Sequence, residues 1–132
     1  MKYFQRIWGI MSRECECMQV PDDVERGVSK AGGLKAILGS IPDDEGLDSL
    51  ASMVAALSDG YRLKILASLS RTDLCPCLLK SVTGLTDSKL SYHLNVLSRA
   101  GMIESRRDGN WRIISLTPLG RDSVEKVLSI IR

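Results

Sequence analysis

Apolar positions recur at helical spacing along much of the chain, separated by glycines, prolines and short polar clusters. In the first third several glycines and Pro42 interrupt the pattern, and residues 24–38 carry only weak helical spacing. Asp43 is a predicted N-cap, because a short acceptor side chain here satisfies the free N–H groups of a first helical turn. The helix that follows has one apolar face, made of Leu47, Leu50, Met53, Val54 and Leu57. A second helix is predicted over residues 61–69, with Leu63, Leu66 and Leu69 three apart.

Residues 73–101 predict two helices joined by a tight turn. Proline suits the first position of a helix, and the residue before it prefers an extended conformation. A short helix is therefore expected to begin at Pro76 and to end near Gly84. Thr86 or Asp87 then caps a helix that reads to Gly101, with a buried stripe of Leu90, Leu94 and Leu97. Two such helices around a four-residue turn are typical of a helix-turn-helix.

The period changes after Gly101. Residues 103–107 and 111–115 read as two strands, and the Asp-Gly-Asn stretch at residues 108–110 is a strong hairpin signal because glycine readily takes positive φ. A final helix begins at Thr117-Pro118, with Val124, Val127, Leu128 and Ile131 on its apolar face. Helix-turn-helix, hairpin and helix in this order predict a winged helix.

The predicted fold class is mainly α (α+β), a winged helix-turn-helix with a two-stranded wing. We expect residues 1–42 to form an N-terminal arm and helix, and residues 43–132 to form the DNA-binding domain with its C-terminal helix. A chain of 132 residues builds a modest core. Its apolar terminal helices would therefore gain from burial against a partner.

The overall composition says little about function, whereas the distribution of charged residues along the chain is informative. Hydrophobic residues make up 44% and charged residues 26%, an ordinary globular balance, and the net charge is only +2. Residues 14–48 hold nine acids against three bases, whereas residues 89–121 hold six bases against two acids. This asymmetry favours a polyanion as the partner of the C-terminal half. An aromatic content of 5% argues against a stacking platform for single strands.

Nothing in the sequence indicates a membrane partner. No stretch approaches the roughly 20 apolar residues of a membrane span. The apolar segment at the start of the sequence is too short and too often interrupted for a signal peptide. We expect a cytoplasmic protein, for which Met11 is an alternative translation start. In a reducing cytoplasm the four cysteines are better interpreted as thiols or metal ligands than as structural disulfides.

The helix over residues 88–99 has the division of faces that major-groove reading requires. Its leucines face inward, while polar side chains remain outward to reach base edges or phosphates. The hairpin adds arginines suited to backbone or minor-groove contact. The predicted DNA-binding residues are Thr86, Ser88, Lys89, Ser91, Tyr92, His93, Asn95, Arg106, Arg107 and Arg112. The sequence is compatible with either a structural or a DNA-facing role for His93.

Three stretches of this pattern resemble the ArsR/SmtB repressors. Residues 57–66, LSDGYRLKIL, are similar to the family's opening motif, and residues 89–103, KLSYHLNVLSRAGMI, to its reading helix. Residues 106–111 look like its wing. The resemblance implies a transcriptional regulator that binds double-stranded DNA as a homodimer, joined through its N- and C-terminal helices. It also implies an inverted-repeat operator from which an effector releases the protein.

The cysteines form two CxC pairs, Cys15 with Cys17 and Cys75 with Cys77. Inside a regular helix, residues two apart point about 200° away from each other and cannot share an ion. At a helix start, with Cys75 extended before Pro76, both sulfurs can converge. A helix N-terminus also lowers a thiol pKa, which favours both metal binding and oxidation.

Residues 73–77, DLCPC, resemble the metal box of the arsenic-, cadmium- and lead-sensing ArsR members. The resemblance implies an effector such as As(III), Cd, Pb or Zn at Cys75 and Cys77, with Cys15 and Cys17 completing the site. Proline replaces the usual middle residue, and Leu78 stands where an acid is common. The family's C-terminal metal site is not carried over, because that helix offers Asp122 and Glu125 but no histidine.

Other interpretations of the cysteines stay open. The pairs could respond to oxidants or sulfide on the same fold, or have no sensory role. A metal-binding or interaction module without DNA binding is a further alternative. A thiol oxidoreductase is not expected, because no βαβ pattern surrounds Cys75 and the chain has a single histidine.

Overall fold

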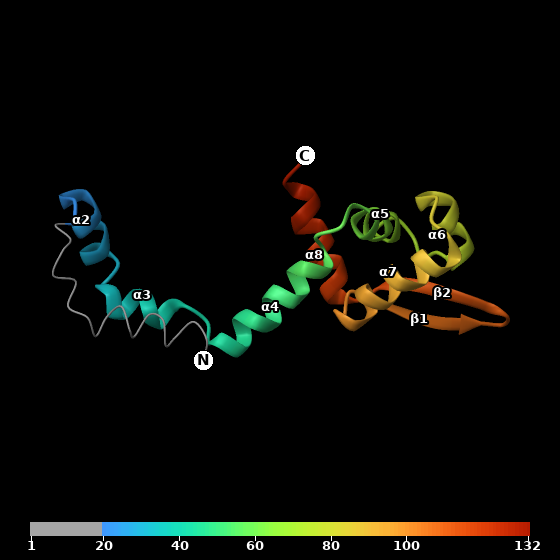
Figure 1. Ribbon diagram of the computed structural model, residues 1–132, viewed down its shortest axis with the longest axis horizontal. Coiled ribbons are helices and arrows are strands. Elements are labelled where there is room, and N and C mark those ends of the chain that lie inside the picture. Colours follow the sequence, from blue (N-terminus) through green and yellow to red (C-terminus); the bar gives the residue numbers. More distant parts are fainter. Residues whose placement is uncertain (1–19) are drawn as a thin grey trace. The chain divides into compact units, whose positions relative to one another are not determined.

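The computed structural model describes residues 20–132. The chain forms two compact units that divide between Ala51 and Ser52, and each is described by itself. The described residues form seven helices and one two-stranded antiparallel sheet (Figure 1). This confirms the mainly α fold class. The predicted division into domains between residues 42 and 43 stays a prediction.

The first helices are α2 (Asp22–Lys30), α3 (Leu34–Ser40) and α4 (Asp44–Ala56). The weak helical pattern over residues 24–38 is two helices, because Gly32 and Gly33 between them take φ of +93° and +91°. Glycine adopts this region without the steric cost that a side chain brings. Asp43 is confirmed as an N-cap, since its carboxylate accepts a hydrogen bond of 2.9 Å from the Gly46 N–H.

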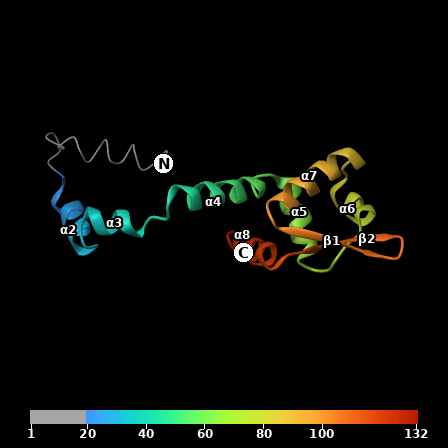
Figure 2. The same cartoon turned by 90° about the horizontal axis from the view of Figure 1, so that it is seen from below.

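The second unit carries α5 (Gly60–Leu69), α6 (Pro76–Thr83) and α7 (Asp87–Arg99), then the hairpin of β1 (Ile103–Asp108) and β2 (Trp111–Leu116), and finally α8 (Pro118–Ser129). The predicted helix-turn-helix, hairpin and closing helix are confirmed. The hairpin projects beyond the helices as a wing (Figure 2). Its strands pair in register from Ile103 opposite Leu116 to Asp108 opposite Trp111.

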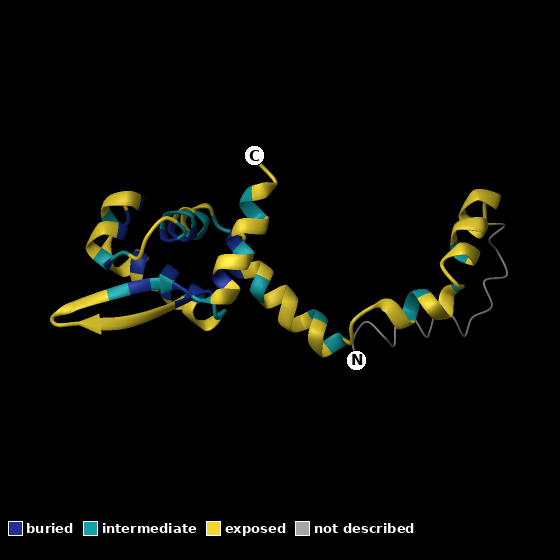
Figure 3. Ribbon diagram, turned by 180° about the vertical axis from the view of Figure 1, so that it is seen from behind, coloured by how far each residue is buried: buried dark blue, intermediate teal, exposed yellow. Residues whose placement is uncertain are grey.

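One hydrophobic core lies between these elements, and the outer part of the wing is exposed (Figure 3). The predicted stripe of Leu90, Leu94 and Leu97 is buried. On α5 the prediction was incomplete, since Ile65 is fully buried while Leu63 is only half-buried. The fully buried large side chains are Ile65, Leu66, Leu69, Leu79, Leu97, Met102, Ile114 and Val124.

Helix α8 comes very close to the chain that leaves α7. Thr117 caps it by accepting a hydrogen bond of 3.0 Å from the Gly120 N–H, and its own N–H donates to the Met102 carbonyl at 3.1 Å. A Cβ on Gly120 would lie 1.9 Å from that carbonyl oxygen. Only a residue without a side chain fits, so Gly120 fixes the closing helix against the start of the wing.

Candidate DNA interface and dithiol site

Helix α7 presents the polar face that the sequence predicts. Thr86 is the N-cap, its hydroxyl accepting a hydrogen bond of 3.4 Å from the Lys89 N–H. Three leucines anchor the opposite face in the core. The outward side chains, all exposed, are those of Ser88, Lys89, Ser91, Tyr92 and Asn95. These residues offer donors and acceptors of the kind that meet base edges and phosphates in a major groove.

The turn between α6 and α7 is fixed at three points. Gly84 ends α6 in the left-handed region at φ +73°, which is the usual place for glycine after a helix. The Thr83 hydroxyl donates to the Leu79 carbonyl at 2.7 Å and accepts from the Leu85 N–H at 3.3 Å. Lys80 on α6 pairs with Asp87 on α7 at 2.9 Å. These contacts join the end of α6 to the start of α7.

The wing concentrates positive charge on its outer half. Arg106, Arg107 and Arg112 are exposed, and Arg107 lies directly opposite Arg112 across the hairpin. Like charges directly opposite each other destabilise a strand pair, and an anionic partner relieves that repulsion. Residues 52–132 hold twelve lysines and arginines against seven acids, a net charge of +5, whereas residues 20–51 hold three against seven, a net charge of −4.

Sequence reasoning missed Trp111 at the tip of the wing. Its side chain is 62% exposed and is flanked on its strand by Arg112. A large aromatic ring left in water is a feature of surfaces that meet a partner. The available signal was its place at the end of the predicted wing, beside the hairpin turn.

His93 lies inside α7 rather than on its outward face. It is 9% exposed, and its Nδ1 accepts a hydrogen bond of 3.2 Å from Nη1 of Arg62. The Arg62 Nε also donates to the Ala56 carbonyl at 2.7 Å. Arg62 thus joins the end of α4 to α7, and this geometry favours the structural interpretation of His93.

Asp59 completes this cluster as the N-cap of α5. Its carboxylate accepts from the Arg62 N–H at 3.1 Å and lies 3.9 Å from the His93 Nδ1. The hydrogen bond from the Arg62 N–H is the main cause that lowers the pKa of Asp59 below its ordinary value, and the nearby His93 and Arg62 side chains lower it further. The family-like stretch at residues 57–66 is therefore built around a capping aspartate and a bridging arginine.

Cys75 and Cys77 meet at the start of α6. Cys75 is the extended N-cap residue, with φ −81° and ψ 158°, and Pro76 takes the first helical position. The two sulfurs lie 2.7 Å apart as free thiols, Cys75 buried and Cys77 exposed. The helix start therefore brings the pair together, as the proline predicted.

The two thiols differ in acidity because one donates to the other. The hydrogen bond from Cys77 is the main cause that lowers the pKa of Cys75, and the Leu78 N–H in the first turn of α6 lowers it further. The same hydrogen bond raises the pKa of Cys77, with burial adding to the effect. Cys75 is thus the thiol that ionises first, and thiolates are the form that binds soft ions.

Two sulfurs on one side of a helix start fit part of the coordination shell of a soft ion. Within residues 20–132 no group of three or more histidine, cysteine, aspartate or glutamate side chains is arranged to hold a metal. The pair would need further ligands from elsewhere. Cys15 and Cys17, predicted to supply them, lie outside the described residues.

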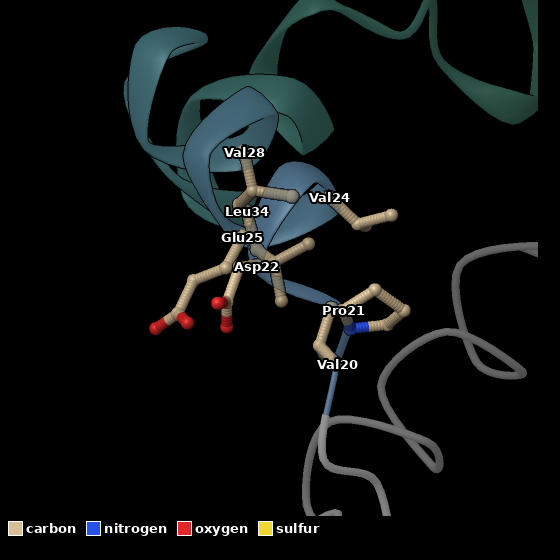
Figure 4. A pocket seen from close by; sticks show the side chains of 7 residues that line it. All are labelled: Val20, Pro21, Asp22, Val24, Glu25, Val28 and Leu34. Atoms are coloured by element: carbon tan, nitrogen blue, oxygen red, sulfur yellow. The ribbon is translucent and has the colours of Figure 1, made fainter.

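A separate hollow lies in the N-terminal unit. Figure 4 shows it between α2 and the start of α3, with Asp22 and Glu25 beside apolar side chains. Its lining is Val20, Pro21, Asp22, Val24, Glu25, Val28 and Leu34. None of the predicted site residues takes part in it.

Comparison with known proteins decides the family. The model of the bacterial regulatory proteins of the arsR family matches residues 59–105, from the Asp59 cap to the first wing strand. The cadmium resistance transcriptional regulatory protein CadC of Listeria innocua is 33% identical over 90 residues, covering 61% of this chain and 76% of that protein. The chain belongs to the ArsR family.

A second relative and a solved structure are also similar to this chain. The arsenical resistance operon repressor of Staphylococcus aureus is 33% identical over 82 residues, covering 62% of this chain and 79% of the repressor. The homodimeric winged helix-turn-helix DNA-binding domain Mb0332 of Mycobacterium bovis has the same fold, with a TM-score of 0.62 at 24% identity over 70% of this chain and 88% of that domain.

Membership of the ArsR family makes this chain a DNA-binding transcriptional regulator, and the proteins of the family are not enzymes. None of the helices between residues 20 and 132 is long and apolar enough to cross a bilayer.

Proposed function

We propose that this ArsR-family protein is a repressor that a thiophilic metal or metalloid releases from its operator by binding Cys75 and Cys77. The observation that carries the proposal is the convergence of the two sulfurs, 2.7 Å apart, at the first turn of the helix before the reading helix. The cadmium and arsenical resistance regulators among its relatives support this class of effector. Arsenite, Cd, Pb and Zn are the candidate ions, and Cys15 and Cys17 are the candidate further ligands.

In the ligand-free protein the outward face of α7 reads the operator. We assign this role to Ser88, Lys89, Ser91, Tyr92 and Asn95, with Thr86 at the cap. Arg106, Arg107 and Arg112 supply phosphate or minor-groove contacts. His93, buried against Arg62, supports α7 from behind. Ligation of Cys75 and Cys77 would act at the start of α6, the helix that the turn at Thr83 and Gly84 joins to α7.

The active form is a homodimer on an inverted-repeat operator. Exposed apolar side chains on α4 and after α8 support this proposal: Leu50 and Val54 on α4 are 50% and 54% exposed, and Ile130 and Ile131 after α8 are 79% and 82% exposed. Side chains of this size gain free energy from burial against a second copy. Two copies related by a two-fold axis place two reading helices on successive major grooves.

The experiment is a titration of fully reduced protein on labelled promoter DNA, followed by fluorescence anisotropy. Cadmium, lead and arsenite are added in turn, and then an oxidant in a separate series. Release by an ion together with thiolate-to-metal absorbance supports the proposal. Release by the oxidant alone would indicate that the cysteines sense thiol oxidation instead of a metal ion. Tight binding that ignores both contradicts a sensory role, and absence of specific binding contradicts the repressor.

A further inference from the structure

The segment that leads into Cys75 pairs with the wing. The Leu74 N–H donates to the Ile114 carbonyl at 3.1 Å, and the Ile114 N–H donates to the Leu74 carbonyl at 2.8 Å. Leu74 therefore forms an isolated antiparallel bridge with strand β2. The residue next to Cys75 in the chain is thus part of the sheet that carries the wing arginines.

A side-chain contact adds a second link one residue earlier. Nη2 of Arg106, on β1, lies 3.4 Å from Oδ2 of Asp73. An ion pair as exposed as this one stabilises the fold only slightly. Its importance lies in its position, because Arg106 is one of the three wing arginines assigned to DNA. Asp73 and Leu74 therefore connect the dithiol to both strands of the wing.

Ligand binding changes the geometry at Cys75. An ion shared by the two thiolates would replace the hydrogen bond that joins the two sulfurs, so at least one of the sulfurs would have to move when the ion binds. Cys77 is held within α6, while Cys75 precedes the helix and is buried at 9% exposure. A buried residue has little freedom to move alone, so part of the displacement passes to Leu74 and Asp73.

We propose that Asp73 and Leu74 are positioning residues that make the placement of the wing on DNA depend on the state of Cys75 and Cys77. The inference rests on the proposed function, since it concerns the same dithiol. In the ligand-free protein the Leu74–Ile114 bridge and the Asp73–Arg106 pair hold the wing in its DNA-binding position. In the ligated protein the displaced segment shifts β2, and Arg106 is no longer placed to meet a phosphate.

The test uses Asp73→Asn, which keeps the size of the side chain and removes its charge. The quantity measured is the ratio of operator affinities without and with cadmium, which spans about 5- to 150-fold in typical allosteric proteins. We expect Asp73→Asn to reduce this ratio by about 2- to 30-fold, the range in which residues along a coupling route act. The matched control is Asp122→Asn, which breaks the exposed Lys126–Asp122 pair of 2.9 Å on α8.

A spectroscopic readout separates positioning from a merely structural role. The chain has two tryptophans, so Trp8→Phe leaves Trp111 on the wing as the only one. Without DNA, cadmium should shift the Trp111 emission of the Trp8→Phe protein. The shift should be smaller when Asp73→Asn is added, and absent when Cys75→Ser and Cys77→Ser are added instead.

The outcomes separate the two proposals. If cadmium, lead and arsenite all fail to release the unaltered protein, the proposed function is overturned and this inference falls with it. If the unaltered protein is released, and Asp73→Asn shows the same affinity ratio and the same Trp111 shift, the inference alone is overturned. A reduced ratio and a reduced shift in Asp73→Asn, with Asp122→Asn unchanged, support it.

Discussion

The Cys77 sulfur lies 2.7 Å from the Cys75 sulfur and lowers the pKa of Cys75 by donating a hydrogen bond to it. The pair is therefore asymmetric before any ligand arrives. The thiol with the lowered pKa is the buried one, next to the segment that pairs with the wing. The exposed thiol is the one whose pKa is raised.

Removing one thiol should change the pKa of the remaining thiol, and the direction of the change should depend on which thiol is removed. We expect Cys77→Ala to raise the pKa of Cys75, because the donor to the thiolate is lost, and Cys75→Ala to lower the pKa of Cys77. The thiolate fraction of Cys75 at a given pH then falls, and that of Cys77 rises. Ultraviolet thiolate absorbance against pH, in a Cys15→Ser and Cys17→Ser background, measures both. Equal pKa values for each thiol with and without its neighbour would refute the pairing.

Gly120 should tolerate no side chain. Gly120→Ala places a Cβ 1.9 Å from the Met102 carbonyl oxygen, so the backbone of α8 must shift. We expect a loss of about 1–3 kcal/mol in the free energy of unfolding, the usual cost of overpacking. Gly60→Ala in the same unit is the control, because a Cβ there has nothing within 4 Å. The measurement is urea unfolding, and equal stability of the two variants would be the contrary result.

Asp59 should stabilise the fold both as a cap and as a charge. Asp59→Ala removes the acceptor for the Arg62 N–H, and we expect a loss of about 1 kcal/mol. Asp59→Asn keeps an acceptor and is the matched control. Urea unfolding at neutral pH compares the three proteins, and an alanine variant as stable as the unaltered protein would refute the cap.

The charge of Asp59 has a pH signature. Its folded-state pKa lies below the ordinary value, so its ionised form contributes stability that is present above the unfolded-state pKa and is lost as the pH falls through the folded-state pKa. We expect Asp59→Asn to lose less stability than the unaltered protein over this acid range. Parallel losses for both proteins would show that the Arg62 and His93 contacts do not favour the charged form.

Lys89, on the outward face of α7, should contribute to operator affinity and to its salt dependence. We expect Lys89→Ala to weaken operator binding and to reduce the slope of log affinity against log salt by about one, as for a single phosphate contact. Lys126→Ala on α8 is the control, since Lys126 pairs with Asp122. Anisotropy at several salt concentrations gives both slopes. A slope unchanged by Lys89→Ala would remove this residue from the interface.

Much of the fold follows from local rules in the sequence. Pro76 predicts where α6 begins, Thr86 and Gly101 predict the two ends of α7, and the Asp-Gly-Asn turn predicts the wing. Each is a residue with a restricted or special backbone preference, so its effect is local. The convergence of Cys75 and Cys77 followed from the same reasoning.

Tertiary contacts were beyond the sequence pattern. The burial of His93 depends on Arg62, which lies 31 positions earlier, and the Asp73–Arg106 contact joins residues 33 positions apart. Periodicity within one element contains no information on such pairs. The exposure of Trp111 likewise depends on how far the wing projects from the core, which strand length alone does not give.

The role of Cys75 and Cys77 is tested by comparing the unaltered protein with the double variant Cys75→Ser and Cys77→Ser on labelled operator DNA. Both proteins are fully reduced, and anisotropy is followed while cadmium is titrated. We predict that both proteins bind the operator with similar affinity, that cadmium releases the unaltered protein, and that the double variant stays bound. Release of the double variant at the same cadmium concentration as the unaltered protein would contradict the assignment of Cys75 and Cys77 as the effector site.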